Sequence, residues 1–594
     1  MMEIENQTEL VRLCLEAAGE SRESIEKWRR QRRSLERLPA HLADSLLRHL
    51  IRRRLLFPSL LEVFKRSVEV INLRGENYVD GEWLAYLGAF RYLRSLNLAY
   101  CHKISSSAIW PLAGMSSLKE LDISRCVKVT DAGIKHLLSI PTLEKLCLSE
   151  TGVTENGVEL LSSLKNLSVL DLGGLPVTDP VLSSLQVLTK LQYLDLWGSK
   201  ISNEGACVLE MFPRLSFLNL AWTNVTKLPK MLSLECLNLS NCTIDSILEL
   251  NEEKAPLVKL SLSGTTFVNE AEAFLHIETS FLSFLDVSNS SFNSFCFLPE
   301  MKALEHLDLS SSILRDDTIE KVVCMGANLR NLSLSNTRIS SAGVGVLAGH
   351  LPNLEILSLS GTQIDDVAMS YISMMTSLKA IDLSNTDIEG FIRQVGAETD
   401  LVLSLTALQS LNHLERLNLE QTQVRDAALS PLSNFQELQH FSLRSPSLTD
   451  ISLHPLSSLS KLTHLSICDA VLTDYGLGSF RPPETLKLLD LRGCWLLSGD
   501  SIMLFCKRNP QIEVRHERRS VAPSDQVGPN RPSPSRISLR ASQMNKKPEQ
   551  LPLSLCFIDQ RLKYSREELL ELQYSTLSLE LPHDNDDQEV MRLE

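Results

Sequence analysis

Apolar residues recur along this chain in a short phrase that alternates apolar and polar positions. The phrase has leucine or a similar residue at its first, fourth and sixth positions, and Cys, Thr or Ser at its ninth. Clear copies begin at Leu93, Leu118, Leu329 and Leu486. Alternation with a period of two predicts a short strand, whose leucines face a core and whose intervening side chains face the other way.

Eighteen copies are present if the degenerate VEVINLRG at Val68 is included. They begin at positions 68, 93, 118, 143, 167, 191, 215, 234, 257, 282, 304, 329, 354, 378, 414, 438, 462 and 486. Most steps are 24 or 25 residues, a period typical of leucine-rich repeats. The chain resembles the ribonuclease-inhibitor-like, cysteine-containing repeat type. The predicted fold class is α/β: a right-handed solenoid (horseshoe) of about 18 repeats, with an N-terminal helical cap and a partly disordered C-terminal tail.

Each repeat is expected to run from strand through turn to helix. The side chain at the ninth position turns inward and satisfies backbone groups of the turn. Helix starts are indicated by Thr130, Ser202, Ser340 and Thr473, which are good N-cap residues before apolar patterns. Because one repeat cannot bury its own face, neighbouring repeats must stack.

Two steps break the rhythm. The step from 215 to 234 is short, so an extended segment around Pro229 is expected there in place of a helix. The step from 378 to 414 is long, which predicts a loop or short helix outside the arc at 390–403. Such an insertion either serves a function or is simply tolerated at the surface.

Residues 1–67 are not repeats, and they are expected to be helical. Leu38-Pro39 opens one helix, and Phe57-Pro58 ends it before another begins. Such a region would at least cap the first repeat, because an open solenoid end exposes core residues to water.

This N-terminal region also contains Leu10-Val-Arg-Leu-Cys14-Leu-Glu-Ala-Ala18, followed by LPAHLADSLLRHL from Leu38. The first motif resembles an elongin-binding box, and the second resembles a cullin box. Their order before leucine-rich repeats is similar to that in the Zyg family of substrate receptors for cullin–RING ubiquitin ligases. The second motif also resembles a degenerate F-box. The resemblance covers roughly residues 7–100.

The resemblance implies a cullin–adaptor complex and a substrate protein as partners. The implied adaptor-binding residues are Leu10, Cys14 and Ala18, with Leu38, Pro39 and Leu42 towards the cullin. The chain departs from the Zyg pattern, because it has more repeats and no armadillo-type repeats after them. Substrate recognition would therefore move to the solenoid. An alternative is a leucine-rich repeat scaffold in intracellular signalling, in which residues 1–67 are only a cap and Cys14 is an ordinary apolar residue.

Charge and cysteine content narrow the function classes. The net charge of −14 argues against a general nucleic-acid binder, although residues 21–66 carry 13 Lys/Arg against 5 Asp/Glu. The thirteen scattered cysteines favour reduced, intracellular thiols. No signal core or membrane-spanning stretch is evident. We therefore expect a cytoplasmic or nuclear protein that binds neither nucleic acid nor membrane.

The C-terminal part follows the predicted solenoid of residues 68–515. Residues 516–550 are rich in Ser, Pro and Arg, which predicts a disordered linker with a plausible phosphorylation site at Ser533. Residues 551–594 combine a strand-like segment, a short helix at 565–574 with a capping box, and an acidic end. This segment either folds back onto the solenoid or docks on a partner. Regulation through the tail is a further alternative.

Two groups on the expected concave surface are candidate partner sites. The first is an aromatic cluster on adjacent strands with an acidic rim, which favours a basic or amino-terminal partner segment, unless Trp222 merely covers the short repeat. It comprises Tyr193, Trp197, Phe217, Trp222, Asp171 and Asp195. The second is basic and suits an acidic peptide or a phosphate, unless it only balances the acidic body. It comprises Arg416, His440, Arg444, His464 and Arg492.

Catalytic chemistry finds no support in the sequence. There is no phosphate-cradling glycine loop, no metal-spaced Cys/His cluster and no nucleophile motif. We therefore expect a non-enzymatic protein without a cofactor or metal.

Overall fold

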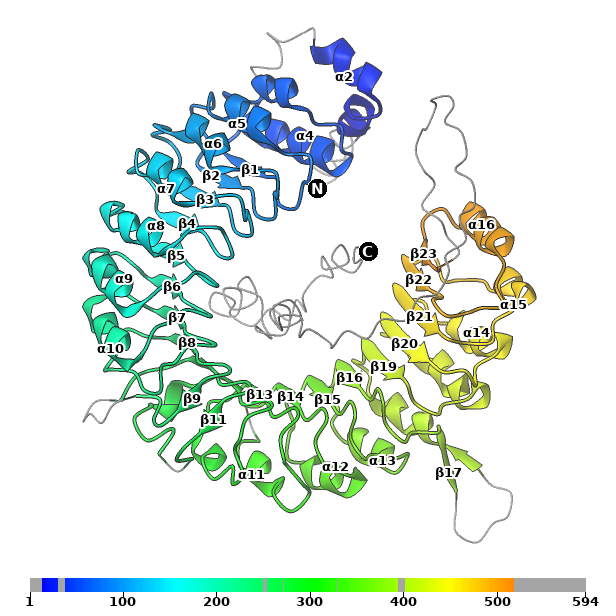
Figure 1. Ribbon diagram of the computed structural model, residues 1–594. Helices are drawn as coiled ribbons and strands as arrows, with labels where there is room; N and C mark the ends of the chain where they lie inside the picture. Colours follow the sequence, from blue (N-terminus) through cyan, green and yellow to red (C-terminus); the bar gives the residue numbers. More distant parts are fainter. Residues whose placement is uncertain are drawn as a thin grey trace, which may run out of the picture. The chain divides into compact units, whose positions relative to one another are not determined.

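The computed structural model describes residues 13–29, 38–248, 254–270, 272–326, 328–393 and 401–517. The chain forms two compact units that divide between Leu282 and Ser283. Within each unit, short parallel strands lie on one face, and helices or irregular segments lie on the other (Figure 1). The predicted leucine-rich repeat solenoid is confirmed.

The strands of the first unit pair in parallel, each with the strand of the next repeat. Each begins two residues after the first position of its phrase, as the alternation predicts. They are β1 (Val70–Asn72), β2 (Ser95–Asn97), β3 (Glu120–Asp122), β4 (Lys145–Cys147), β5 (Val169–Asp171), β6 (Tyr193–Asp195), β7 (Phe217–Asn219), β8 (Cys236–Asn238) and β10 (Lys259–Ser261).

The strands of the second unit continue the same pattern within that unit. They are β12 (Phe284–Asp286), β13 (His306–Asp308), β14 (Asn331–Ser333), β15 (Ile356–Ser358), β16 (Ala380–Asp382), β19 (Arg416–Glu420), β20 (His440–Arg444), β21 (His464–Cys468), β22 (Leu488–Asp490) and β23 (Glu513–Arg515). Strand β23 has no copy of the full phrase. Its only sequence signal is the alternation of the buried Ile512 and Val514 with polar residues.

Helices follow most strands, and they are short because a repeat leaves room for only one or two turns. In the first unit they are α5 (Gly81–Leu87), α6 (Ser106–Ile109), η2 (Trp110–Leu112), α7 (Asp131–Leu137), α8 (Glu155–Glu159), η3 (Leu160–Ser163), α9 (Asp179–Ser184), η4 (Leu185–Val187), α10 (Asn203–Ala206), η5 (Cys207–Met211) and η6 (Thr279–Phe281). In the second unit they are η7 (Leu298–Glu300), α11 (Glu320–Val323), α12 (Ser341–Leu347), α13 (Ala368–Ile372), η8 (Ser404–Ser410), η9 (Asp426–Asn434), η10 (Asp450–Ser452), α14 (Leu453–Leu456), α15 (Asp474–Ser479) and α16 (Gly499–Arg508).

The predicted helix starts are confirmed. Thr130, Ser202, Ser340 and Thr473 are the N-cap residues of α7, α10, α12 and α15. The side chains of the last three accept a backbone N–H of the first turn, whereas that of Thr130 does not. The ninth-position side chains also turn inward as expected: the Cys126 thiol, for example, donates to the Leu98 carbonyl at 3.2 Å.

Two parts of the repeat pattern differ from expectation. The segment around Pro229 is extended, as predicted. In the next two repeats, the described residues form the short paired strands β9 (Thr243–Ile244) and β11 (Thr266–Phe267) and no α-helix. The described residues of the insertion at 390–403 are 390–393 and 401–403; of these, 391–393 and 401–403 are extended where a loop or short helix was expected. They form an antiparallel hairpin of β17 (Phe391–Arg393) and β18 (Leu401–Leu403), which is consistent with the high strand propensity of their Phe, Ile, Val and Leu residues.

The described parts of the N-terminal region are mostly helical, as expected. Residues 13–18 are helical, followed by α2 (Arg22–Arg29), α4 (Ala40–Arg52) and the 3-10 helix η1 (Pro58–Val63). Leu46, Leu47 and Leu50 of α4 are buried. Gly19 packs so tightly that a Cβ there would lie 2.5 Å from the His49 ring, which fixes the first helical segment against α4.

Candidate functional site

One row of side chains crosses the strand face of the first unit. Tyr193, Phe217, Cys236 and Lys259 occupy the first positions of β6, β7, β8 and β10, and the parallel register places each beside the next. We call these four residues the Tyr193 row. Because first positions point away from the leucine core, the row belongs to the face on which a ligand would bind.

The aromatic part of this row is stacked and buried. The Tyr193 and Phe217 rings lie 4.1 Å apart with an interplanar angle of 6°. Tyr193 is 3% exposed, Phe217 2% and Cys236 4%. The strand register brings Tyr193 and Phe217 together, as expected. Their side chains are buried, however, so the expected exposure of this cluster is wrong.

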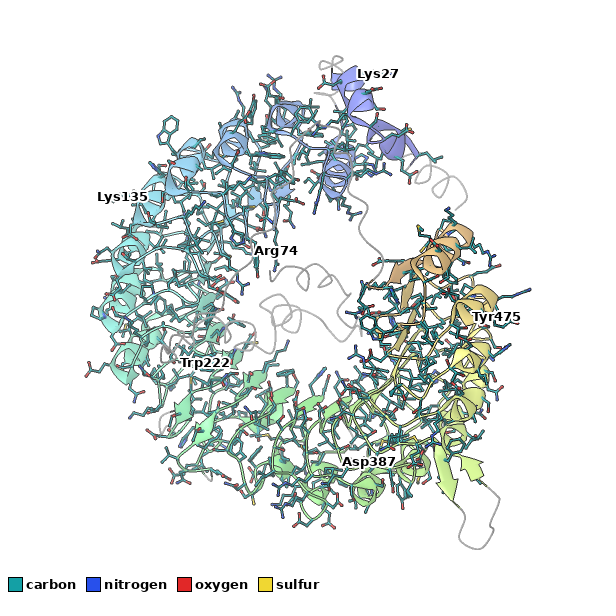
Figure 2. All side chains as sticks on the ribbon, turned by 45° about the vertical axis from the view of Figure 1, so that its right-hand side comes forward. Lys27, Arg74, Lys135, Trp222, Asp387 and Tyr475 are labelled. Carbon is teal, nitrogen blue, oxygen red and sulfur yellow. The ribbon has the colours of Figure 1, made fainter. Side chains whose placement is uncertain are left out.

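The two tryptophans lie in the turns after the strands, not on the strands themselves. Trp197 is 6% exposed and covers Gly173, where a Cβ would lie 2.0 Å from the indole Nε1. Trp222 has a φ of 61°, a conformation that costs a bulky residue free energy. Figure 2 labels Trp222, and this residue lines a cavity of about 360 Å³ together with Thr223, Asn224, Thr226, Asn241 and Thr243.

The carboxylates beside the row are tied into the repeat framework. Asp171 Oδ1 accepts the Gly173 N–H at 3.0 Å, and Asp195 Oδ1 accepts the Trp197 N–H at 3.0 Å. Asp195 Oδ2 also accepts from the Asn219 amide at 3.1 Å. These hydrogen bonds shape the turns after the strands, so both carboxylates have a structural role whatever else they contact.

Lys259 is the functional candidate that the sequence argument missed. It is 8% exposed, and its Nζ has no hydrogen-bond partner. Burial lowers the pKa of the ammonium to about 8, although the neighbouring Cys236 and Glu235 act in the opposite direction. The signal was available, because Cys236 and Lys259 stand at the same phrase position as Tyr193 and Phe217. A buried ammonium without a partner is costly and favours an anionic group nearby.

The predicted basic group lies on the strand face of the second unit. Arg416, His440 and His464 are adjacent in the register of β19, β20 and β21, and the two imidazole rings stack at 4.3 Å. Burial, Arg416 and His464 lower the pKa of His440 to about 4. His440 is therefore neutral at pH 7, and among the described residues Arg416 has no acidic partner within ion-pair distance.

The other two predicted basic residues are neutralised by neighbours. Arg444 Nε lies 3.3 Å from a carboxylate oxygen of Asp469. Arg492 binds Asp490 through both Nε and Nη2, at 2.9 and 2.6 Å from Oδ2. Much of the expected positive charge is thus balanced locally, and anion binding at this group stays a prediction.

The predicted adaptor-binding residues remain accessible where they are described. Cys14 and Pro39 are exposed, and Ala18, Leu38 and Leu42 are half-buried. Leu10 lies outside the described residues. Had Cys14 and Ala18 been buried against the first repeat, an adaptor would have had no surface to bind, so the structure leaves the prediction open.

Two further kinds of site, a metal cluster and a membrane-spanning helix, are absent from the residues that the structure describes. Within them, no group of three or more His, Cys, Asp or Glu residues is arranged to hold a metal ion. None of the described helices has the length and hydropathy required to span a bilayer. Ser533 and the helix expected at 565–574 lie outside the described residues.

Comparison with known proteins agrees with the repeat architecture. Residues 327–388 and 114–138 match family models described as leucine rich repeat. The chain is a leucine-rich repeat protein. F-box/LRR-repeat protein 12 of Arabidopsis thaliana is 31% identical over 115 residues, which are 19% of this chain and 29% of that relative.

Two solved structures are similar to this chain at low sequence identity. A leucine-rich repeat protein of Leptospira interrogans is 17% identical with a TM-score of 0.37, covering 77% of this chain and 98% of that one. The TLR13–ssRNA13 complex gives 19% identity and a TM-score of 0.49, covering 75% of this chain and 61% of the other.

Proposed function

We propose that this leucine-rich repeat protein is the substrate-recognition subunit of a cullin–RING E3 ubiquitin ligase. The observation that carries the proposal is the exposed Cys14, on a helical segment that precedes the repeats and packs on α4. An adaptor needs an accessible apolar anchor on a rigid support, and this segment supplies one.

In this proposal, Leu10, Cys14 and Ala18 insert into the adaptor. Leu38 and Pro39 form the next contact, because they stand at the start of α4. The partial similarity to a relative named as an F-box/LRR-repeat protein, over 19% of this chain, supports a link to an F-box-type adaptor.

The repeats then bind the substrate protein on their strand faces. A solenoid presents a long side-chain surface suited to protein recognition. We assign the chain no catalytic activity and no cofactor of its own, since ubiquitin transfer would be performed by the other subunits. Action in the cytoplasm or nucleus is consistent with the many cysteines that are free thiols in the structure.

Direct binding to an adaptor tests the proposal. Purified full-length chain is titrated with the elongin adaptor complex and, separately, with an F-box-type adaptor. Cys14→Arg replaces an exposed side chain and should weaken binding about tenfold or more without affecting the fold. Leu13→Arg is the matched control, because Leu13 is 51% exposed and lies outside the motif positions.

Two results would contradict the proposal. If neither adaptor binds the unmodified chain, residues 13–67 are only a cap and the protein is a scaffold. If both variants bind as tightly as the unmodified chain, Cys14 is not an anchor.

A further inference from the structure

The Tyr193 row is more deeply buried than its position in a repeat explains. Asn97 on β2 and Asn219 on β7 occupy equivalent strand positions, and each donates its amide to an aspartate of the neighbouring strand, at 3.2 and 3.1 Å. Asn219 is nevertheless 1% exposed, whereas Asn97 is half-exposed. The same side chain with the same hydrogen bond is therefore covered in one repeat and open in the other.

Stacking between neighbouring rings does not account for this burial. His440 and His464 stand at the same phrase position as Tyr193 and Phe217 and stack at a similar separation, 4.3 against 4.1 Å. Both histidines remain half-exposed. Even the small Cys236, which lacks a ring, is 4% exposed. The row must therefore carry a cover that the histidine pair lacks.

The chemistry of the row defines what that cover should offer. Apolar groups fit Tyr193, Phe217 and Cys236, while the buried Nζ of Lys259 lacks a hydrogen-bond partner and favours a carboxylate. Asp195 already accepts hydrogen bonds within the framework, so it favours a basic partner less than the sequence suggested. A segment rich in both leucine and acidic residues matches the row.

We propose that residues 564–594 of the same chain dock on the Tyr193 row, with a carboxylate of this segment against Lys259. The segment has nine Asp/Glu and two Lys/Arg, a net charge of −7. It also contains leucines suited to the aromatic part of the row, at positions 569, 570, 572, 577, 579, 581 and 593. The preceding residues 518–550 have the opposite charge, with seven Lys/Arg against two Asp/Glu.

The connecting chain is long enough for this docking. Residues 518–563 can extend to about 150 Å. At about 4.8 Å per strand, the parallel strands of either unit span only about 50 Å or less. The docked segment would cover the face predicted to bind a partner, so a partner for this face would have to displace it. The inference does not depend on the ligase proposal.

Cys236 provides a native reporter for the cover. In the full-length chain, six tail leucines (569, 570, 572, 577, 579 and 581) are replaced by serine, and maleimide labelling of each cysteine is followed by peptide mass spectrometry. Labelling of Cys236 should become about tenfold faster, because an uncovered thiol is accessible and ionises more easily. The matched control replaces Ile537, Leu539 and Met544 by serine and should leave the rate unchanged.

Other cysteines calibrate the same experiment. Cys207 and Cys324 are exposed and should label quickly in every variant, while Cys126 is buried in the repeat core and should stay protected. Fast labelling of Cys126 would reveal unfolding of the tail variant. If Cys126 stays protected, the synthetic peptide 564–594 is added to the tail variant. Renewed protection of Cys236 would support the proposal, and continued fast labelling of Cys236 would contradict it.

An unchanged Cys236 rate in the folded tail variant would overturn the proposal. So would protection that persists in that variant and rises with protein concentration, because a second copy would then be the cover. Lys259→Met tests the carboxylate contact and should also speed labelling of Cys236. Lys145→Met is its control, since Lys145 stands at the same phrase position on β4 but is half-exposed; equal effects of both variants would refute the assigned contact.

Discussion

Replacing Asp450 with alanine should uncouple two neighbouring repeats of the second unit. Asp450 Oδ1 accepts the Thr473 N–H at 2.7 Å, and Oδ2 accepts the Thr473 hydroxyl at 2.5 Å. Thr473 is the N-cap of α15, and its hydroxyl oxygen accepts the Gly476 N–H at 3.2 Å. The carboxylate thus orients the side chain that caps the next helix, so one substitution weakens both contacts.

The magnitude follows from the two lost hydrogen bonds. Each hydrogen bond to a charged group contributes about 1.5–3 kcal/mol, so two such bonds contribute about 3–6 kcal/mol. Because Asp450 is only half-buried, water screens part of this, and we expect a loss of about 2–4 kcal/mol. In a solenoid this loss acts mainly on the interface between adjacent repeats. Asp450→Asn should lose less, because its amide oxygen still accepts the Thr473 N–H.

Amide hydrogen exchange over residues 474–479 measures this effect locally, which suits a chain too long for a two-state analysis. Exchange there should accelerate by about thirtyfold or more, the equivalent of 2 kcal/mol. Asp387→Ala is the control, since Asp387 is exposed. If the amides of α15 exchange at the same rate in the Asp450→Ala and Asp387→Ala variants, the Asp450 carboxylate does not couple the repeats.

Three further predictions concern other parts of the molecule. The free energy of unfolding should fall as the pH drops from about 6.5 to 4, because His440 binds a proton in the unfolded chain but stays neutral in the folded one, where its pKa is about 4. In urea titrations, His440→Gln should flatten part of this pH dependence, and an unchanged slope would contradict the prediction. Asp366→Ala removes the acceptor of the Glu389 and Gly390 N–H groups, at 2.9 and 2.8 Å, and should expose the β17–β18 hairpin to limited proteolysis; Asp387→Ala should not. Gly173→Ala should displace Trp197 and shift its fluorescence, whereas an unshifted spectrum would show that the indole is not held against this glycine.

The strand positions could be predicted from the sequence because each depends on a few apolar residues within one repeat. The same holds for the N-caps at Ser202 and Thr473, which act over two or three residues. The hairpin at 390–403 was missed because an irregular spacing shows that residues are inserted but not how they pair. The other repeats contain no equivalent of this insertion, so the repeat pattern could not predict its structure.

The candidate sites were less predictable for a different reason. The register that joins Tyr193 to Phe217 follows from the period, but their burial depends on what lies over the strand face, which no repeat encodes. The charge of the basic group was overestimated because Asp490 and Asp469 pair with Arg492 and Arg444. Such pairings depend on side-chain geometry that a phrase position does not specify.

Affinity capture from cell lysate tests the ligase assignment most directly. The tagged full-length chain is compared with a variant carrying Leu10→Ala, Cys14→Ala, Leu38→Ala and Pro39→Ala, and with a Leu13→Ala control. We expect the unmodified chain and the control to retain a cullin and an adaptor, and the fourfold variant to lose both. Absence of a cullin from all three, or its retention by the fourfold variant, would contradict the assignment.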